Sequence, residues 1–189
     1  MIYSIAQIKA TLAEQHSSKT IVCTCGCFEI FHVGHLECLE KAKELGDILI
    51  VGINSDKYIE ERKNRKPIFN ENERCEIIAS LRHVDYVFLF DDPTFDNCLT
   101  ELRPNYFAKG VDRTEVLEQK TAAKLGIEIV HIGEKKRASA TDLRKHFLPN
   151  KHDTTPQKNC SQPGKRKGQS LGRGFKPSPN TAHIFFENI

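Results

Sequence analysis

Short apolar runs alternate with stretches of helical periodicity over the first 148 residues of this 189-residue chain. The five runs that predict buried strands are 20–25, 47–53, 84–90, 106–108 and 127–131. Helical patterns occupy 4–14, 36–45, 70–81, a segment through Leu99 and Leu102, 115–125 and 139–147, and the charged segment 57–69 is predicted to be irregular. Asn70, with Glu73 three residues on, is predicted to begin the third of these helices with a capping box. This alternation is typical of βαβ units with right-handed crossovers. We therefore predict an α/β fold built on a doubly wound, Rossmann-like parallel sheet of five strands.

Residues 24–35, T-C-G-C-F-E-I-F-H-V-G-H, join the first predicted strand to a helix through a glycine-containing turn. The first turn of a helix has unpaired N–H groups and partial positive charge, so it attracts phosphate. His32 and His35 lie one helical turn apart on the same side, and Gly34 lets a large anion approach the backbone. We interpret the two histidines as phosphate-binding groups. Ordinary polar residues at a helix start are the alternative.

The net charge of +3 is divided unevenly along the chain. Residues 1–148 hold 21 Lys and Arg against 23 Asp and Glu, whereas residues 149–189 hold 7 against 2. We predict one domain at 1–148 and a flexible basic tail at 149–189, which is rich in Pro, Gly, Ser, Lys and Asn. Nucleic-acid binding is not expected of the domain, although the tail could contact RNA or an acidic partner. No apolar run is long enough to span a bilayer and no signal pattern is present, so we expect a cytoplasmic protein without a membrane partner.

The seven cysteines do not form a disulfide pattern, because their number is odd and they are scattered through strand and helix patterns. Reduced thiols fit better. Cys25 and Cys27 with His32 and His35 would supply four ligands of the type that zinc prefers. Phosphate binding by the histidines is the interpretation that we favour, with no metal held by direct protein ligands. No P-loop or G-x-G-x-x-G motif occurs.

The segment G-C-F-E-I-F-H-V-G-H resembles the H-x-G-H signature of the nucleotidyltransferase superfamily, which includes cytidylyltransferases and sugar-phosphate adenylyltransferases. Residues 1–148 most closely resemble the adenylyltransferase domain of ADP-heptose synthesis enzymes. The resemblance implies catalytic roles for His32 and His35. It also implies nucleotide contacts from the turn itself, at Cys27, Phe28, Val33 and Gly34. Glu29 departs from the family pattern, which has Asp, and a longer carboxylate would shift whatever group it orients.

Two further segments resemble substrate-binding elements of this superfamily. Residues 67–74, P-I-F-N-E-N-E-R, resemble R-P-I-N-x-E-x-x-R, which implies that Lys66 and Arg74 face substrate phosphates and act in catalysis. Residues 81–85, L-R-H-V-D, resemble the I-R-Y-V-D segment of cytidylyltransferases and imply substrate binding by Arg82. Asn54, which follows the second predicted strand, is expected beside the substrate. A solvated surface charge is the alternative for Lys66.

Two later segments resemble elements that hold the nucleotide. Residues 107–112, F-A-K-G-V-D, resemble V-K-G-G-D, which places Lys109 on the triphosphate and Asp112 on a ribose hydroxyl or Mg²⁺. Residues 137–141, R-A-S-A-T, resemble R-x-S-T-[ST] at the start of the final helix. There the resemblance implies that Arg137, Ser139 and Thr141 bind the β- and γ-phosphates, as a helix start can. A plain helix cap at Ser139 is the alternative, and Ser139 could serve both as a cap and as a phosphate ligand.

Together these features predict a nucleotidyltransferase that moves AMP from ATP, with Mg²⁺, to a sugar 1-phosphate such as a heptose 1-phosphate, and releases pyrophosphate. Cytidylyl transfer from CTP to glycerol 3-phosphate or a similar phospho-alcohol is the alternative that Arg82 favours. A non-catalytic nucleotide- or RNA-binding module is a third hypothesis, motivated by Glu29 and the basic tail. A homodimer is the assembly that the family resemblance implies.

Overall fold

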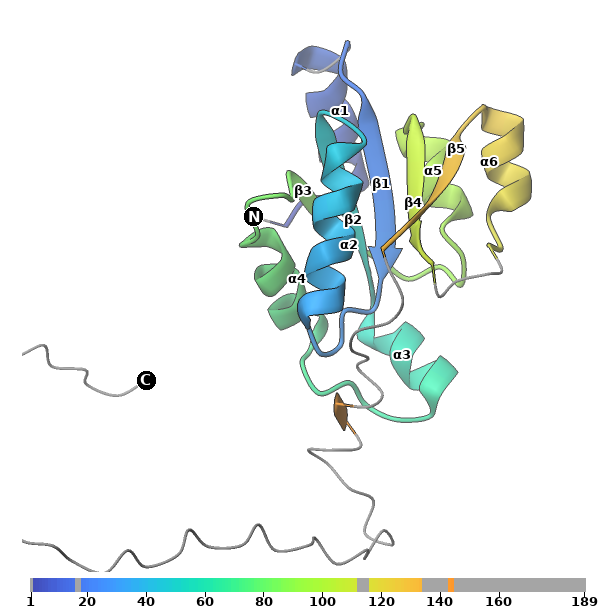
Figure 1. The fold of residues 1–189 in the computed structure, drawn as a ribbon. Coiled ribbons are helices and arrows are strands. Elements are labelled where there is room, and N and C mark those ends of the chain that lie inside the picture. The colour runs from blue at the N-terminus through green and yellow to red at the C-terminus, as the bar shows by residue number, and fades with distance from the viewer. Residues whose placement is uncertain (1, 16–17, 112–115, 134–142, 145–189) are drawn as a thin grey trace, which may run out of the picture. The chain divides into compact units, whose positions relative to one another are not determined.

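The computed structural model describes residues 2–15, 18–111, 116–133 and 143–144. All of them lie in the first of the two units into which the chain divides, Met1–Asp153 and Thr154–Ile189. Within these residues five parallel strands form one sheet (Figure 1), which confirms the predicted fold class. The strands are β1 Ile21–Gly26, β2 Ile48–Asn54, β3 Tyr86–Phe90, β4 Tyr106–Gly110 and β5 Glu128–Ile132. The helices are α1 Ile5–Gln15, α2 Val33–Glu44, α3 Asp56–Lys63, α4 Glu71–Ala79, α5 Asp96–Leu102 and α6 Gln119–Leu125.

The strand order β3-β2-β1-β4-β5 places β1 at the centre of the sheet. β1 pairs with β2 from Ile21↔Ile48 to Gly26↔Ile53, and β4 pairs with its other edge. The chain therefore moves outward through β2 and β3 and then crosses to the far side of β1. This reversal creates a topological switch point between β1 and β4, and ligands of such sheets bind beyond the carboxyl ends of the strands there.

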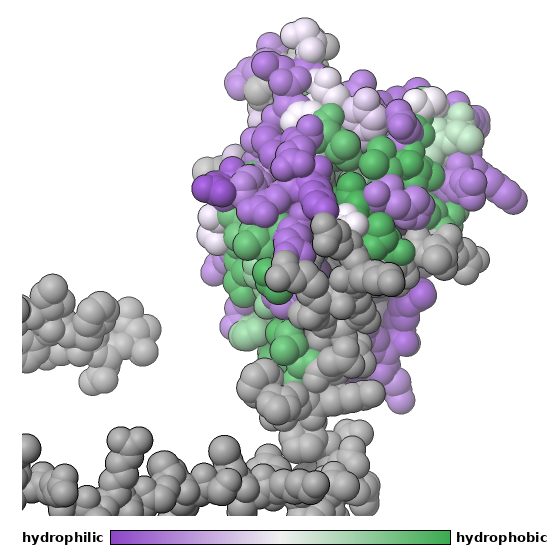
Figure 2. Space-filling model, in the orientation of Figure 1, coloured by the Kyte–Doolittle hydropathy of each residue, from purple (hydrophilic) through white to green (hydrophobic). Residues whose placement is uncertain are grey.

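Helices cover both faces of the sheet (Figure 1), and every residue of β2 is buried, as expected for a strand covered on both sides. The apolar layer under α2 and α4 contains Leu39, Ala42, Cys75 and Ile78. The layer under α1, α5 and α6 contains Ile8, Leu12, Cys98, Leu99 and Ala122. In the space-filling view (Figure 2) the solvent side of α2 is hydrophilic, and hydrophobic residues show beside it over β4 and β5.

The segment predicted to be irregular, 57–69, instead contains most of the helix α3. Ser55 begins this helix, because its side chain accepts a backbone N–H from the first turn at 3.0 Å. Ile59 is fully buried and anchors the helix to the core. Asn64 ends it in the left-handed conformation, with φ of 48°. A single buried residue gives no apolar stripe, so periodicity could not reveal this helix.

Other predicted boundaries shift by a few residues. β3 begins at Tyr86 rather than at residue 84, and α6 begins at Gln119 rather than at residue 115. The predicted last helix lies mostly outside the described residues, of which 143–144 are helical. Among the helices that the structure describes, none is both long enough and apolar enough to cross a membrane.

The capping box predicted at the start of α4 is confirmed. The Asn70 side chain accepts backbone N–H groups of Asn72 and Glu73 at 3.0 and 3.1 Å. The Glu73 carboxylate in return accepts the Asn70 N–H at 2.8 Å. This reciprocal pair fixes the first turn of α4, and Arg74 is the next residue of that helix.

Gly52 lies in β2 against the aromatic side chains of the α5 layer. A Cβ at this position would lie 2.5 Å from the Phe95 ring and 3.2 Å from the Phe88 ring. Phe95 also stacks on Phe107, with ring centroids 5.4 Å apart, so it has little room to move away. We predict that Gly52→Ala lowers the free energy of unfolding by about 1–3 kcal/mol through overpacking. Urea unfolding would measure this change; the double variant with Phe95→Leu should recover part of it, and an unchanged midpoint for Gly52→Ala would contradict the prediction.

Candidate functional site

The turn between β1 and α2 lies at the carboxyl edge of the sheet, beside the switch point. Phe28 adopts a positive φ of 46°, which is unusual for a residue with a side chain. A Cβ on residue 26 would lie only 3.1 Å from the Phe28 ring, so the glycine at this position leaves room for the ring. The same ring packs edge-on against His35, with centroids 5.1 Å apart. The G-C-F sequence therefore shapes the turn that carries the histidines.

His32 and His35 lie together at the start of α2. His32 is the N-cap residue with extended backbone angles, and His35 donates its N–H to the His32 carbonyl at 2.9 Å. The two imidazoles stack with centroids 3.8 Å apart and an interplanar angle of 19°. Phe31 stacks on His35 at 5.8 Å. Since the helix ladder starts at His35, the N–H groups of Val33 and Gly34 fall among those that a helix start leaves to a cap or a ligand.

Arg74 does not project into open space as its predicted role on substrate phosphates required. Its side chain is 0% exposed, and Nε donates to the Phe69 carbonyl at 3.2 Å. One terminal nitrogen donates to the Cys27 carbonyl, and the other to the Asn54 carbonyl at 2.9 Å and to Asp56 Oδ1 at 2.7 Å. A guanidinium removed from water needs such acceptors. Within this structure Arg74 therefore ties the H-x-G-H turn to the end of β2 and the start of α3.

Glu29 is 2% exposed and is surrounded by three cations. Arg65 makes a two-pronged interaction with the carboxylate, in which Nη2 lies 2.8 Å from Oε2. Lys63 Nζ lies 3.0 Å from Oε2, and Arg144 Nη1 lies 3.0 Å from Oε1. Burial disfavours the charged carboxylate, but the hydrogen bonds from Arg65 and Lys63 outweigh it and lower the pKa of Glu29 to about 2. Sequence reasoning missed all three partners and selected the neighbouring, exposed Lys66 instead.

Cys27 and Asn54 also meet at this edge. Asn54 is buried at the end of β2, and the Cys27 thiol lies 3.6 Å from its Oδ1. The structure therefore brings Asn54 next to the turn, with both its backbone carbonyl and its side chain in contact with protein groups.

Lys109, at the end of β4, is held on several sides by protein groups. Its Nζ lies 3.4 Å from the Glu118 carboxylate and 3.5 Å from Cys25 Sγ. It also lies 4.5 Å from the centroid of the Phe107 ring. The Glu118 carboxylate also accepts a hydrogen bond from the backbone N–H of Phe95, at 3.0 Å. Four other predicted nucleotide contacts, Asp112, Arg137, Ser139 and Thr141, lie outside the described residues.

Arg82 lies at the opposite edge of the sheet, which does not fit the substrate-binding role predicted for it within this chain. It belongs to the turn that leads into β3, where the Asp85 N–H donates to the Leu49 carbonyl near the start of β2. Arg82 Nε donates to His83 Nε2 at 3.0 Å, and His83 Nδ1 lies 3.8 Å from a Glu40 oxygen. The resemblance of the motif could not show at which edge of the sheet Arg82 lies, because that depends on the direction of β3.

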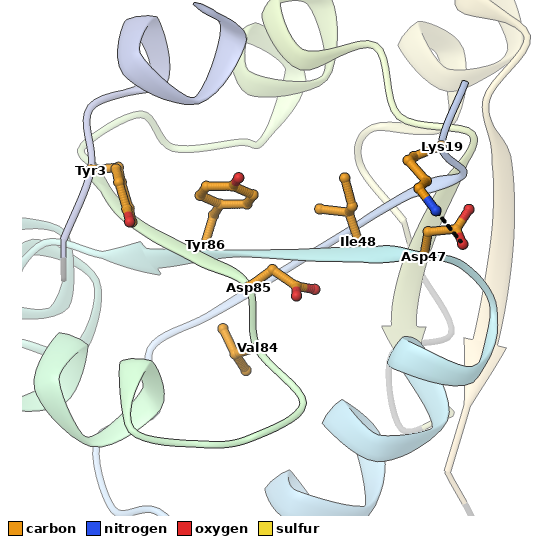
Figure 3. Close-up of a pocket in the computed structure, with 7 residues that line it drawn as sticks. All are labelled: Tyr3, Lys19, Asp47, Ile48, Val84, Asp85 and Tyr86. Carbon is orange, nitrogen blue, oxygen red and sulfur yellow. Dashed lines mark ion pairs between the residues drawn. The ribbon is translucent and has the colours of Figure 1, made fainter. Parts of the chain in front are cut away.

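A cavity of about 460 Å³ lies at this same amino edge (Figure 3). Ile48 and Tyr86, the first residues of β2 and β3, line it. So do Lys19 and Asp47, which form an ion pair at 3.7 Å. Ligands of doubly wound sheets bind at the other edge. The cavity is therefore separate from the H-x-G-H turn and is not a candidate nucleotide site.

Residues 23–158 match the profile of the family described as cytidylyltransferase-like. The chain belongs to the cytidylyltransferase-like family. The bifunctional protein HldE of Campylobacter fetus subsp. fetus (strain 82-40) is 40% identical over 111 residues, which cover 58% of this chain and 24% of that protein. HldE of Helicobacter pylori (strain Shi470) is 46% identical over 99 residues, which cover 52% of this chain and 21% of that protein. The matched part thus spans about a quarter or less of these relatives.

Solved structures show the same family fold. The lipopolysaccharide core biosynthesis protein of Thermoplasma volcanium GSS1 matches with a TM-score of 0.56 and 31% identity, and covers 63% of this chain and 100% of that one. Pantoate-beta-alanine ligase of Francisella tularensis matches with a TM-score of 0.56 at 16% identity, over 77% of this chain and 76% of that one. The second likeness concerns the fold alone.

The nucleotidyltransferase resemblance implies a divalent metal such as Mg²⁺. Mg²⁺ keeps several waters and is bound through substrate phosphates and one or two carboxylates. Here Glu29 is already paired with three cations and Asp56 with Arg74. Among the described residues, no group of three or more His, Cys, Asp or Glu side chains is placed to hold a metal ion. This set fits an ion carried in by a triphosphate rather than a protein cage.

The six cysteines among the described residues are free thiols, of which Cys23, Cys75 and Cys98 are buried and the other three are half-buried. Burial raises the pKa of Cys25 to about 11, and it raises the pKa of Cys98 to about 12. Zinc binds the thiolate form of cysteine, so burial works against the zinc alternative at Cys25. Cys25 instead lies beside Lys109, and Cys27 beside Asn54.

We predict that Arg74→Met lowers the free energy of unfolding by about 3–5 kcal/mol, because it leaves Asp56 and several carbonyls without their buried partner. Urea unfolding measures the change. Arg82→Met is the matched control, since Arg82 is exposed, and it should cost less than about 1 kcal/mol. Equal, small effects of the two substitutions would show that the Arg74 contacts do not hold the turn.

The lowered pKa of Glu29 also predicts acid sensitivity. A carboxylate with a folded-state pKa of about 2, against 4.5 for the free group, contributes stability above about pH 4.5 that is lost as the pH falls toward 2. The contribution is about 3 kcal/mol at neutral pH, at 1.36 kcal/mol per pKa unit. Unfolding free energies measured by urea over this pH range should fall less steeply for Glu29→Gln than for the native chain. Parallel curves would contradict this assignment.

Proposed function

We propose that this chain is a nucleotidyltransferase that transfers AMP from ATP to a sugar 1-phosphate, such as a heptose 1-phosphate, and releases pyrophosphate. The stacked pair His32 and His35 at the start of α2, next to the switch point, carries the proposal. Likeness to proteins named HldE and to a lipopolysaccharide core biosynthesis protein supports a sugar-linked substrate. Since the chain matches only a quarter or less of the HldE proteins, the proposal concerns this domain and not their full activity.

The reaction is a displacement at the α-phosphorus. A phosphate oxygen of the sugar phosphate forms a bond to the α-phosphorus in line with the bond that breaks, and pyrophosphate leaves with the electron pair. The imidazoles of His32 and His35 and the N–H groups at the start of α2 would donate hydrogen bonds to oxygens that gain charge. No covalent enzyme intermediate is needed, so positioning and charge stabilisation account for catalysis. Mg²⁺ bound with the triphosphate would neutralise part of its charge.

Other predicted residues take different roles in this proposal. Arg74 acts as a positioning residue, because its donors are used by the turn and the end of β2. Lys109 is held by Glu118 near the switch point, where it would neutralise nucleotide phosphates. Arg137, Ser139 and Thr141 would hold the leaving pyrophosphate, as the family resemblance implies. Lys66, exposed beside Arg65, remains a proposed contact for the sugar phosphate.

Cytidylyl transfer to glycerol 3-phosphate loses its main support in this structure, because Arg82 lies at the opposite edge of the sheet. Release of pyrophosphate should therefore be measured with ATP and CTP, each combined with heptose 1-phosphate and with glycerol 3-phosphate. We expect turnover with ATP and the sugar phosphate. Turnover only with CTP and glycerol 3-phosphate would reverse the choice of substrate while leaving the reaction class intact.

We predict that His32→Ala and His35→Ala each reduce kcat by about 10²–10³, the cost of removing one donor to a transition-state oxygen. Pyrophosphate release at saturating substrate measures the loss. His83→Ala serves as the matched control, because His83 lies at the other edge of the sheet, and it should keep near-native turnover. Undiminished pyrophosphate release by both site variants would refute the proposed mechanism.

The hypothesis of a non-catalytic RNA-binding module makes opposite predictions. It requires RNA retention that disappears when residues 149–189 are deleted, with no pyrophosphate release by the full chain. A gel-shift comparison of the full and shortened chains, run beside the turnover assay, separates the two.

A further inference from the structure

Glu29 accepts as many hydrogen bonds as a carboxylate can. Its Oε1 contacts Arg65 and Arg144, and its Oε2 contacts Arg65 and Lys63. An ionised carboxylate has about four acceptor sites, so these contacts occupy all of them. The partners come from distant segments of the chain, 34 to 115 residues away from Glu29 in sequence. One buried carboxylate thus gathers three cations, Lys63, Arg65 and Arg144, which we call the cationic cluster.

The cationic cluster carries more charge and more donors than Glu29 can balance. Three positive charges against one negative charge leave a surplus of two. Each Arg has five N–H donors and the Lys has three, so the donors of the cationic cluster outnumber the acceptor sites of Glu29. The side chains of Lys63, Arg65 and Arg144 keep 37%, 30% and 27% of their surface exposed. Arg65 also donates to the Lys66 carbonyl at 3.2 Å, and the donors that remain belong to partly exposed side chains beside the turn that carries His32.

Without Glu29 the cluster would not hold together. Like charges repel at these distances, and long Lys and Arg side chains lose rotamer freedom when they are fixed. Glu has one methylene more than the Asp that the resembled family carries at this position, which gives its carboxylate a longer reach. A cluster fixed before the substrate arrives costs less to organise during binding.

We propose that Glu29 is a positioning residue that holds Lys63, Arg65 and Arg144 as a preformed binding site for phosphate oxygens of a substrate. The inference rests on the proposed function and deepens it, because it assigns a phosphate site to three residues outside the family motifs. The phosphate comes either from the nucleotide or from the sugar phosphate. Both sources offer the same chemistry, and the experiment below distinguishes them.

The substitution Glu29→Gln tests the inference by the sign of its effect. It removes a negative charge, so simple charge attraction would tighten phosphate binding. Positioning predicts the opposite, because the cations repel each other and separate. We expect Glu29→Gln to weaken binding roughly 10- to 100-fold, the range that loss of a charged hydrogen bond produces. Glu29→Asp keeps the charge but shortens the reach of the carboxylate, so its binding should be tighter than that of Glu29→Gln and weaker than that of the native chain.

Calorimetric titration of the full chain with MgATP, inorganic pyrophosphate and a hexose 1-phosphate measures the dissociation constants. Glu101→Gln is the matched control: the same change at an exposed carboxylate paired with Lys9, which should leave all three constants unchanged. Weaker pyrophosphate and MgATP binding alone assigns the site to the nucleotide. Weaker hexose 1-phosphate binding alone assigns it to the acceptor.

Equal or tighter binding of all three probes by Glu29→Gln would overturn the inference. If the native chain binds MgATP and only the variant result fails, the proposed function stands. If the native chain itself does not bind MgATP, the proposed function fails first. Should Glu29→Gln not fold, as judged by circular dichroism, Arg144→Gln provides the second test, since it removes one cation and leaves Glu29 paired with Lys63 and Arg65. Unchanged pyrophosphate and hexose 1-phosphate binding by that variant would equally refute the site.

Discussion

The buried guanidinium of Arg74 is the interaction on which the carboxyl edge of the sheet depends. It bonds to backbone carbonyls of Phe69, Cys27 and Asn54 and to the carboxylate of Asp56. These acceptors belong to three separate stretches of chain, the H-x-G-H turn, the junction of β2 and α3, and the segment before α4, so one planar group fixes their relative positions. A cation at 0% exposure is tolerated only because each partner is in place. The position of the turn that leads into the histidines therefore depends on Arg74, in the first turn of α4.

Glu29 also fixes this turn, but here the buried group is an anion surrounded by cations. A single residue separates Cys27, whose carbonyl is bound by a buried cation, from Glu29, whose buried carboxylate is bound by three cations. Between them Phe28 takes its positive φ. Such backbone strain persists only where the surroundings over-determine the conformation. Here the anchors on both sides supply that constraint, and the two imidazoles beyond them can stack in a fixed arrangement.

The fold was predictable because it follows from local patterns, whereas much of the site was not. Apolar runs gave the five strands, the Asn70 and Glu73 pair gave the start of α4, and the histidine spacing placed His32 and His35 at a helix start. No local sequence pattern of this kind shows in which direction a polar side chain points. The inward path of Arg74, the partners of Glu29 and the edge occupied by Arg82 all depend on contacts between residues far apart in sequence. Helix α3 escaped prediction because Ile59 is its single buried residue.

The burial of thiols around β1 has a chemical consequence. The pKa values of Cys25 and Cys98 lie near 11 and 12, and burial holds that of Cys23 well above its ordinary value. Peroxides and disulfide reagents attack the thiolate rather than the thiol. These three side chains, which pack in or beside the apolar layer under α1 and α5, are therefore shielded from oxidants by protonation, and Cys23 and Cys98 are shielded by burial as well. A strand that feeds a candidate active site can thus be rich in sulfur without becoming sensitive to redox conditions.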